Sequence, residues 1–316
     1  MARSTAKLAL KLVVVLSLNA CAHDQPAAPP VQVAASGDFY EVAPLARQGR
    51  PGDVIRSEKI VARSNAGRTV YRLLYRTRDA SGHAVAATGI IVIPTAAPPA
   101  GGWPVLSWGH GTTGMAPSCA PSRLPNMPEA LGFPGVIVGA DYPGLGPNGQ
   151  LHAYMSGLAE GRSMVDIVRA ARIIGGTGVG ARWIAAGASQ GGHASLWAGQ
   201  VARTEARDLD LLGVIAFAPS SESTTPFAND NPALGGAVTA MSLYGRATDD
   251  RRLDPAKYAS PAVAKWSAIL SQKCLADATA AFAALGDAAR WKADPKTTEP
   301  ARSIWLANDP GRAKTG

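Results

Sequence analysis

Short apolar runs of strand length recur along the first two thirds of the chain. The first three are rich in β-branched and aromatic residues and are separated by turn sequences; they cover residues 54–62, 69–77 and 84–93. This pattern is typical of an antiparallel meander. Four later runs cover residues 104–108, 135–140, 183–186 and 211–218. They alternate with segments of helical spacing such as 156–174, so we predict a mostly parallel α/β sheet with helices on both faces.

The pattern changes after residue 219. Alanine-rich segments of helical spacing cover residues 232–244, 261–270 and 275–291, and no strand-like run separates them. We predict a helical cap over the carboxyl edge of the sheet, where it would exclude water and shape a pocket; a packing subdomain without a gating role is the alternative. The predicted organisation is a signal peptide at 1–20, a tether and N-terminal extension at 21–52, an α/β core at 53–219, a cap at 220–305 and a truncated return to the core at 306–316.

One junction between an apolar run and a helical segment carries the pattern Gly187-x-Ser189-x-Gly191. This is the nucleophile-elbow pattern, in which a strand turns sharply into a helix and a serine lies at the apex. Glycines on either side of the apex remove the Cβ atoms that would collide there. We therefore predict that Ser189 is a nucleophile; a Gly/Ser turn without chemistry is the alternative interpretation.

Acyl transfer also needs hydrogen-bond donors for the oxyanion that develops on the substrate. The backbone N–H of Gln190, directly after Ser189, is one predicted donor because it lies at the amino end of a helix. The second predicted donor is the backbone N–H of Thr112 or Thr113, in the glycine-rich loop 109–114 after the fourth apolar run. Both loops are expected at the carboxyl ends of strands, where catalytic loops of such sheets lie.

The N-terminus has the composition of a targeting segment. Three basic residues precede the apolar stretch 12–18, which is too short to anchor stably across a bilayer. The residues Leu18-Asn19-Ala20-Cys21 that follow resemble a bacterial lipoprotein signal, which predicts lipidation of Cys21 and attachment to a membrane surface. We expect an exported lipoprotein of the bacterial cell envelope; a secreted protein with an ordinary signal peptide is the alternative.

Composition excludes several classes of function. The net charge is +8, but Lys and Arg are scattered rather than gathered in a basic strip, which argues against a nucleic-acid partner. No dinucleotide fingerprint, phosphate-binding loop or His-Glu-x-x-His motif occurs in the sequence, so we expect no cofactor and no metal site. Cys119 and Cys274 form an even pair that indicates one disulfide in an oxidising compartment, with two buried thiols as the alternative.

Several motifs together resemble the secretory lipases, which are α/β-hydrolases similar to Candida lipase A and include bacterial members. The motifs are Trp108–Gly114, Cys119–Ser122, Asp141–Gly146 and Gly187–Gly192, followed by the helical insertion. The resemblance runs from about residue 40 to the end of the chain. It implies a cap inserted after the sixth strand, an esterase or lipase activity without a cofactor, and a disulfide between the first loop and the cap, which Cys119 and Cys274 match.

The chain departs from this family in its histidines. In α/β-hydrolases the triad runs in the order Ser, Asp or Glu, then His. The histidines here are His23, His83, His110, His152 and His193. None follows His193, and an aspartate after Ser189, such as Asp277, Asp287, Asp294 or Asp309, has no histidine to orient. We expect that the last two strands are absent, and with them the triad acid and base.

Two functional hypotheses remain. In the first, the chain is a C-terminally truncated carboxylic ester hydrolase with little or no turnover. In the second, it is a surface-anchored binding protein without catalysis on the same fold. The substrate in the first case is a small-molecule or lipid ester, from short-chain esters to glycerides.

Overall fold

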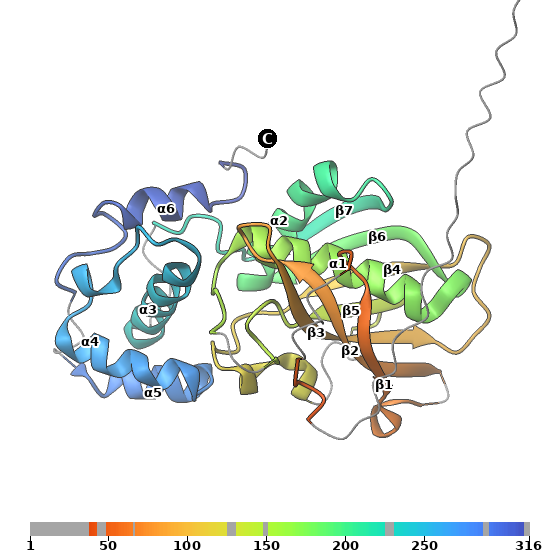
Figure 1. Cartoon of the computed structure of the whole chain (residues 1–316), viewed down its shortest axis with the longest axis horizontal. Helices are drawn as coiled ribbons and strands as arrows, with labels where there is room; N and C mark the ends of the chain where they lie inside the picture. The colour runs from red at the N-terminus through yellow and green to blue at the C-terminus, as the bar shows by residue number, and fades with distance from the viewer. Residues whose placement is uncertain are drawn as a thin grey trace, which may run out of the picture.

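The structure is a computed structural model that describes residues 38–42, 49–65, 67–124, 131–147, 151–224, 231–286 and 291–312. Its centre is a seven-stranded sheet in the order β1-β2-β3-β5-β4-β6-β7. The strands are β1 (Val54–Lys59), β2 (Arg68–Arg78), β3 (Ala84–Pro94), β4 (Trp103–Gly109), β5 (Val136–Ala140), β6 (Val179–Ala188) and β7 (Asp210–Phe217). A body of helices lies beside the sheet (Figure 1).

The direction of the strands divides the sheet into two parts. β1, β2 and β3 form the predicted antiparallel meander, and β3 joins β5 in antiparallel pairing. β5, β4, β6 and β7 run parallel to one another. Because the carboxyl ends of parallel strands share one edge, the loops after Gly109, Ala188 and Phe217 meet there.

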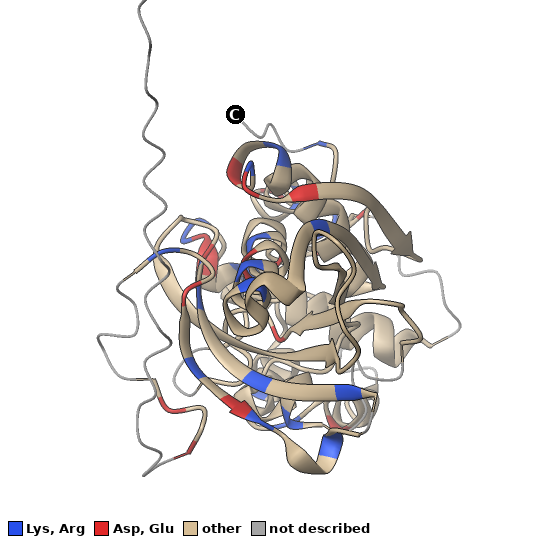
Figure 2. Ribbon diagram, turned by 90° about the vertical axis from the view of Figure 1, so that its right-hand side faces the viewer, with Lys and Arg blue, Asp and Glu red and all other residues tan. Residues whose placement is uncertain are grey.

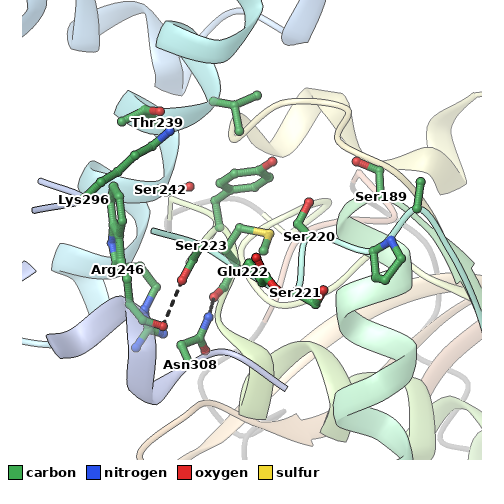
Figure 3. A pocket seen from close by; sticks show the side chains of 16 residues that line it. Ser189, Ser220, Ser221, Glu222, Ser223, Thr239, Ser242, Arg246, Lys296 and Asn308 are labelled. Atoms are coloured by element: carbon green, nitrogen blue, oxygen red, sulfur yellow. Dashed lines mark hydrogen bonds between the residues drawn. The ribbon is translucent and has the colours of Figure 1, made fainter. Parts of the chain in front are cut away.

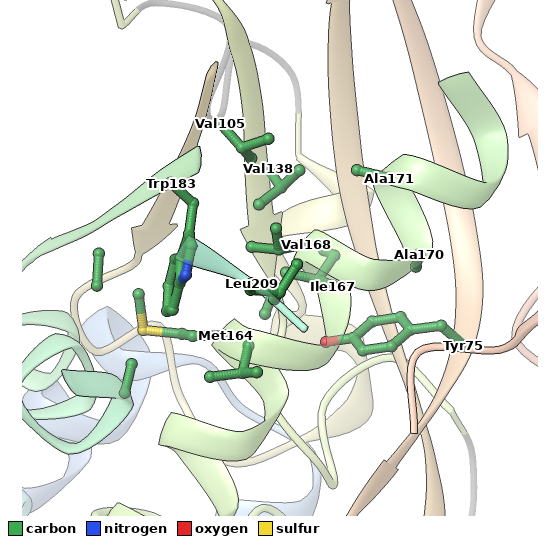
Figure 4. Packing of buried hydrophobic residues seen from close by; sticks show 14 of the residues in the cluster. Tyr75, Val105, Val138, Met164, Ile167, Val168, Ala170, Ala171, Trp183 and Leu209 are labelled. Atoms are coloured by element: carbon green, nitrogen blue, oxygen red, sulfur yellow. The ribbon is translucent and has the colours of Figure 1, made fainter. Parts of the chain in front are cut away.

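Two long helices, α1 (Gly157–Gly175) and α2 (Gln190–Glu205), pack against each other and against β4 and β6. They therefore cover the same face of the sheet, and the prediction of helices on both faces is wrong for the described residues. Under these helices lies the main core, in which Trp183, Met164 and Val168 are fully buried (Figure 4). On the opposite face, Ile90, Val92 and Ile137 are covered by the residues around Phe133 rather than by a helix.

β7 lies at the edge of the described sheet. Four of its large apolar side chains are exposed, with fractions between 36% and 55%: Leu212, Val214, Ile215 and Phe217. An unpaired edge strand with apolar side chains is open to further pairing. The described residues hold no strand beyond β7.

The helical body corresponds to the predicted cap. It contains α3 (Pro232–Asp249), α4 (Pro261–Trp266), α5 (Leu275–Ala283) and α6 (Ala301–Ala307). The predicted helix over 275–291 ends at Ala283, and residues 287–290 lie outside the description. An apolar cluster joins the cap helices to Met115, Tyr154 and Met155 of the core, and in it the rings of Trp266 and Phe282 meet edge to face with centroids 5.0 Å apart.

A disulfide ties the cap to the segment that follows β4. Cys119 and Cys274 form the predicted disulfide, with Cα atoms 5.5 Å apart and a sequence separation of 155. Beside it, the backbone N–H of Leu275 donates to the carbonyl oxygen of Thr113 at 2.8 Å. The start of α5 is therefore held against the loop 109–114.

Charge is distributed over the whole molecule. Figure 2 shows Lys and Arg residues spread over strands and helices, with Asp and Glu among them. No described helix is both long enough and apolar enough to cross a membrane.

Candidate active site

Ser189 lies at the bend between β6 and α2. Its backbone has φ 55° and ψ −118°, a region that side-chain-bearing residues rarely adopt. Its N–H donates to the carbonyl oxygen of Phe217 at 3.0 Å, and its own carbonyl oxygen accepts from the N–H of His193 at 3.0 Å. The strained conformation is thus fixed from the neighbouring strand and from the first helical turn, as the elbow pattern predicts.

The glycines around the bend allow very close backbone contacts. A Cβ atom on Gly187 would lie 2.2 Å from the carbonyl oxygen of Gly191. A Cβ atom on Gly191 would lie 1.9 Å from the carbonyl oxygen of Gly109. Only glycine fits at these positions, and the bend is therefore pressed directly against the first residues of the loop 109–114.

The same loop, which holds the second predicted oxyanion donor (Thr112 or Thr113), lies close to Ser189. A Cβ atom on Gly111 would lie 4.0 Å from the Cβ atom of Ser189. Within the described residues, the backbone N–H groups of Thr112 and Thr113 have no hydrogen-bond acceptor. The N–H of Gln190 is in the first turn of α2 and has no acceptor within that helix. Free N–H donors therefore flank the serine on two sides.

The buried side chain of Tyr154 is bonded to the loop 109–114. Its phenol and the Thr112 hydroxyl lie 2.6 Å apart in a hydrogen bond. Burial raises the pKa of Tyr154, so the phenol stays protonated. The tyrosine was not singled out in the sequence, because a single aromatic residue in a loop carries no local signal.

Three histidines lie buried near the bend, but each is engaged elsewhere. The ring of His110 faces two carbonyl oxygens, at 2.7 Å on Gly111 and at 3.2 Å on Asp141. The ring of His152 contacts the Pro143 carbonyl oxygen and the Gln190 amide. The ring of His193 contacts Glu160 and Asn308. Among the described residues, none of these rings is hydrogen-bonded to the Ser189 hydroxyl.

The aspartates considered as the triad acid have other partners where the structure describes them, and Asp294 accepts from the backbone N–H of Lys296 at 2.9 Å. Asp309 is buried and accepts from the N–H of Ser223 at 2.9 Å and from its hydroxyl. Asp277 lies on the surface of α5 beside Lys273. Asp287 lies outside the described residues, as do His23 and the predicted lipidation site Cys21.

A cavity of about 520 Å³ opens in front of Ser189 (Figure 3). The core contributes the loop after β7, residues 218–223, and the cap contributes α3 and α6 to its walls. Ser189 lies at one side of the cavity, and Arg246 and Lys296 lie at the other. Burial lowers the pKa of Lys296. The cap thus forms the wall that faces the serine.

The described residues contain no cluster of three or more His, Cys, Asp or Glu side chains that could hold a metal ion.

Comparisons with known proteins show the family and the fold of the chain. The model of the secretory lipase family matches residues 130–297. Lipase A of Moesziomyces aphidis is 27% identical over 222 residues, which are 63% of this chain and 46% of that protein. The chain therefore spans about half the length of this curated relative.

Solved structures share the fold. The rice cell wall degrading esterase LipA of Xanthomonas oryzae has a TM-score of 0.64 at 19% identity, with 83% of this chain and 80% of that chain covered. Candida antarctica lipase A in its closed state has a TM-score of 0.64 at 20% identity, with 87% and 68% covered. These neighbours have the α/β-hydrolase fold, as the sequence predicted. Because the family model covers more than half of its residues, the chain belongs to the secretory lipase family, whose Candida lipase A-like members it resembles.

Proposed function

We propose that the chain carries the ester-cleaving site of an exported carboxylic ester hydrolase, with Ser189 as the nucleophile. The observation that supports this most directly is the position of Ser189. It lies at a strained bend, faces the cavity, and has unpaired backbone N–H groups on both sides. This combination is what attack on an ester carbonyl requires.

In the proposed reaction, the Ser189 oxygen attacks the carbonyl carbon of the ester and loses its proton to a base. The carbonyl oxygen becomes an oxyanion, which accepts hydrogen bonds from the N–H groups of Gln190 and of Thr112 or Thr113. Collapse of this intermediate expels the alcohol and leaves an acyl-enzyme, which water then hydrolyses. Each donor is expected to contribute about 3–4 kcal/mol to the transition state.

The base is the part of the mechanism that the described residues do not supply. The rings of His110, His152 and His193 all have partners of their own, and among the described residues none is hydrogen-bonded to the Ser189 hydroxyl. We therefore expect Ser189 in this chain to be acylated slowly and to turn over little. The alternative function, a binding protein without catalysis on the same fold, rests on the same observation.

The proposed substrate is a lipid or small-molecule ester whose acyl group enters the cavity. Apolar side chains of Met155, Val238 and Trp305 line it beside several hydroxyl groups, which suits an acyl chain attached to a polar carbonyl centre. The family is secretory, and we propose lipidation of Cys21 as the link to a membrane surface in the bacterial envelope.

A two-stage assay on this chain tests the proposal. Intact mass after incubation with an alkyl fluorophosphonate should show one adduct, and Ser189→Ala should show none. Hydrolysis of p-nitrophenyl butyrate should be close to background in both proteins. An unlabelled wild-type chain refutes the nucleophile, and serine-dependent turnover refutes the missing base.

A further inference from the structure

A group of buried polar side chains surrounds the side chain of Gln190, the residue that follows Ser189. Glu160 on α1 is at its centre and is fully buried. Its carboxylate accepts from the Gln190 side-chain amide at 2.7 Å, from the His193 ring at 3.0 Å and from the Met155 backbone N–H at 3.1 Å. Three donors thus converge on one carboxylate.

The hydrogens of the Gln190 amide are fully used. One is donated to Glu160, and the other to the ring of His152 at 2.9 Å. His152 can accept it because the opposite nitrogen of its ring donates to the Pro143 carbonyl oxygen at 2.8 Å. Burial lowers the pKa of His152, which favours this neutral ring. Reversing the amide would place its oxygen against the carboxylate, so only one orientation of Gln190 satisfies the group.

His193 connects this group to Asn308, the residue that follows α6. Its ring lies between Glu160 and Asn308, at 3.1 Å from the Asn308 carbonyl oxygen. The Asn308 side chain in turn accepts from the Gly157 N–H at 2.8 Å and lines the cavity. The orientation of Gln190 is therefore linked to a residue in the cavity wall.

A buried carboxylate with no Lys or Arg bonded to it is costly, whereas an apolar residue of similar volume would pack there without that cost. Both hydrogens of the Gln190 amide have acceptors, which fixes one orientation of this side chain, while its oxygen Oε1 has no hydrogen-bond partner among the described residues. The residue held by this group of side chains is Gln190, whose backbone N–H we propose as a donor to the oxyanion.

We propose that Glu160 is a positioning residue, which holds Gln190 so that its backbone N–H stays directed at the forming oxyanion. The proposal rests on the proposed function, since it needs Ser189 as the nucleophile. Glu160 does not touch the substrate; it acts through Gln190, with His193 and Asn308 fixing its far side.

The test compares the phosphonylation of Ser189 in Glu160→Leu and Glu160→Gln, with kinact and KI determined separately. In Glu160→Leu we expect kinact to fall at least about 10-fold with KI unchanged, because the donor is misdirected while the cavity remains. In Glu160→Gln we expect kinact to stay within about 3-fold of the wild type. The new amide can accept from Gln190 and donate to His193, whose ring can change tautomer.

Asp166 offers a matched control on the same helix. It is equally buried, and it bonds Thr77 and Arg169 rather than any residue of the elbow. Asp166→Leu should lower the unfolding temperature and leave kinact unchanged. If Glu160→Leu does not fold, Gln190→Leu tests the same link, since it keeps the backbone N–H and removes the held amide.

Wild-type kinact in Glu160→Leu or Gln190→Leu overturns the proposal. Equal slowing in Asp166→Leu also overturns it, because the effect would then be loss of structure alone. Equal slowing in Glu160→Gln overturns the hydrogen-bond account. A wild-type protein that is not labelled refutes the proposed function instead, so the two failures are distinguishable.

Discussion

Replacing Gly191 with alanine tests how closely the first turn of α2 must pack against the loop 109–114. Gly191 lies in the first turn of this helix, and by helix propensity alone alanine would stabilise it by about 1 kcal/mol. The structure predicts the opposite sign, because the new methyl group would lie 1.9 Å from the Gly109 carbonyl oxygen and 2.7 Å from that of His110.

The magnitude follows from these distances. An ordinary carbon–oxygen contact needs about 3.3 Å, so the loop 109–114 must retreat by about 1.4 Å, the difference from 1.9 Å. A displacement of about 1 Å in a catalytic group costs on the order of 100-fold in rate. Overpacking against backbone costs about 1–3 kcal/mol of folding free energy. We therefore expect Gly191→Ala to be less stable and to be labelled about 100-fold more slowly.

The assay is the rate of fluorophosphonate labelling by intact mass, together with thermal unfolding by circular dichroism. Gly213→Ala is the matched control, because a Cβ atom on Gly213 in β7 meets nothing within 4 Å. It should retain both the labelling rate and the stability. If Gly191→Ala is labelled at the wild-type rate, the loop 109–114 does not supply an oxyanion donor.

Three further predictions concern the surroundings of the site. Tyr154→Phe removes the hydrogen bond to the Thr112 hydroxyl, and labelling should slow by a few-fold, at a net cost of about 1 kcal/mol, which the same mass assay measures. Cys274→Ser opens a disulfide with a sequence separation of 155; the free energy of unfolding in urea should fall by about 2–5 kcal/mol, and reductant should affect only the wild type. Burial raises the pKa of Asp166 from 3.8 to about 6. The stability that the folded protein gains from binding this proton is fully present below pH 3.8 and is lost as the pH rises through about 6. The unfolding temperature of Asp166→Asn, measured relative to that of the wild type, should therefore rise between pH 4 and pH 7.

The features that the sequence predicted well are those written in neighbouring residues. The elbow at Ser189 depends on glycines two positions away on each side, and the meander depends on turn residues between short apolar runs. The disulfide was predictable because only two cysteines, Cys119 and Cys274, follow the N-terminal segment. In each case the cause lies in residues that are close together in the sequence or in the number of cysteines.

The features that the sequence did not predict depend on packing between distant elements. Glu160 lies on the helical segment 156–174, and no local pattern distinguishes it from a surface glutamate. It becomes a buried acceptor only because α1 packs against α2, which brings it to His193 and Gln190. The covering of one sheet face by both helices is likewise set by how the segments between them cross the sheet. The roles of Ser189 and Gln190 remain predictions until the assays above are done.

The structure also explains why labelling and turnover are separate questions in this protein. The proposed nucleophile and the proposed oxyanion donors come from three segments that are fixed to one another by backbone contacts: the end of β6, the first turn of α2 and the loop 109–114. None of these contacts involves a histidine side chain that reaches Ser189. In serine hydrolases, donors and binding alone retain a rate advantage of about 10³–10⁴ over water when triad members are removed. A fluorophosphonate carries its own leaving group, so we expect Ser189 to attack it slowly, with release of fluoride and with solvent water taking the serine proton. Hydrolysis of the acyl-enzyme, in contrast, needs a base to activate water. A chain with this geometry should therefore react once with the phosphonate and then stop at the covalent adduct.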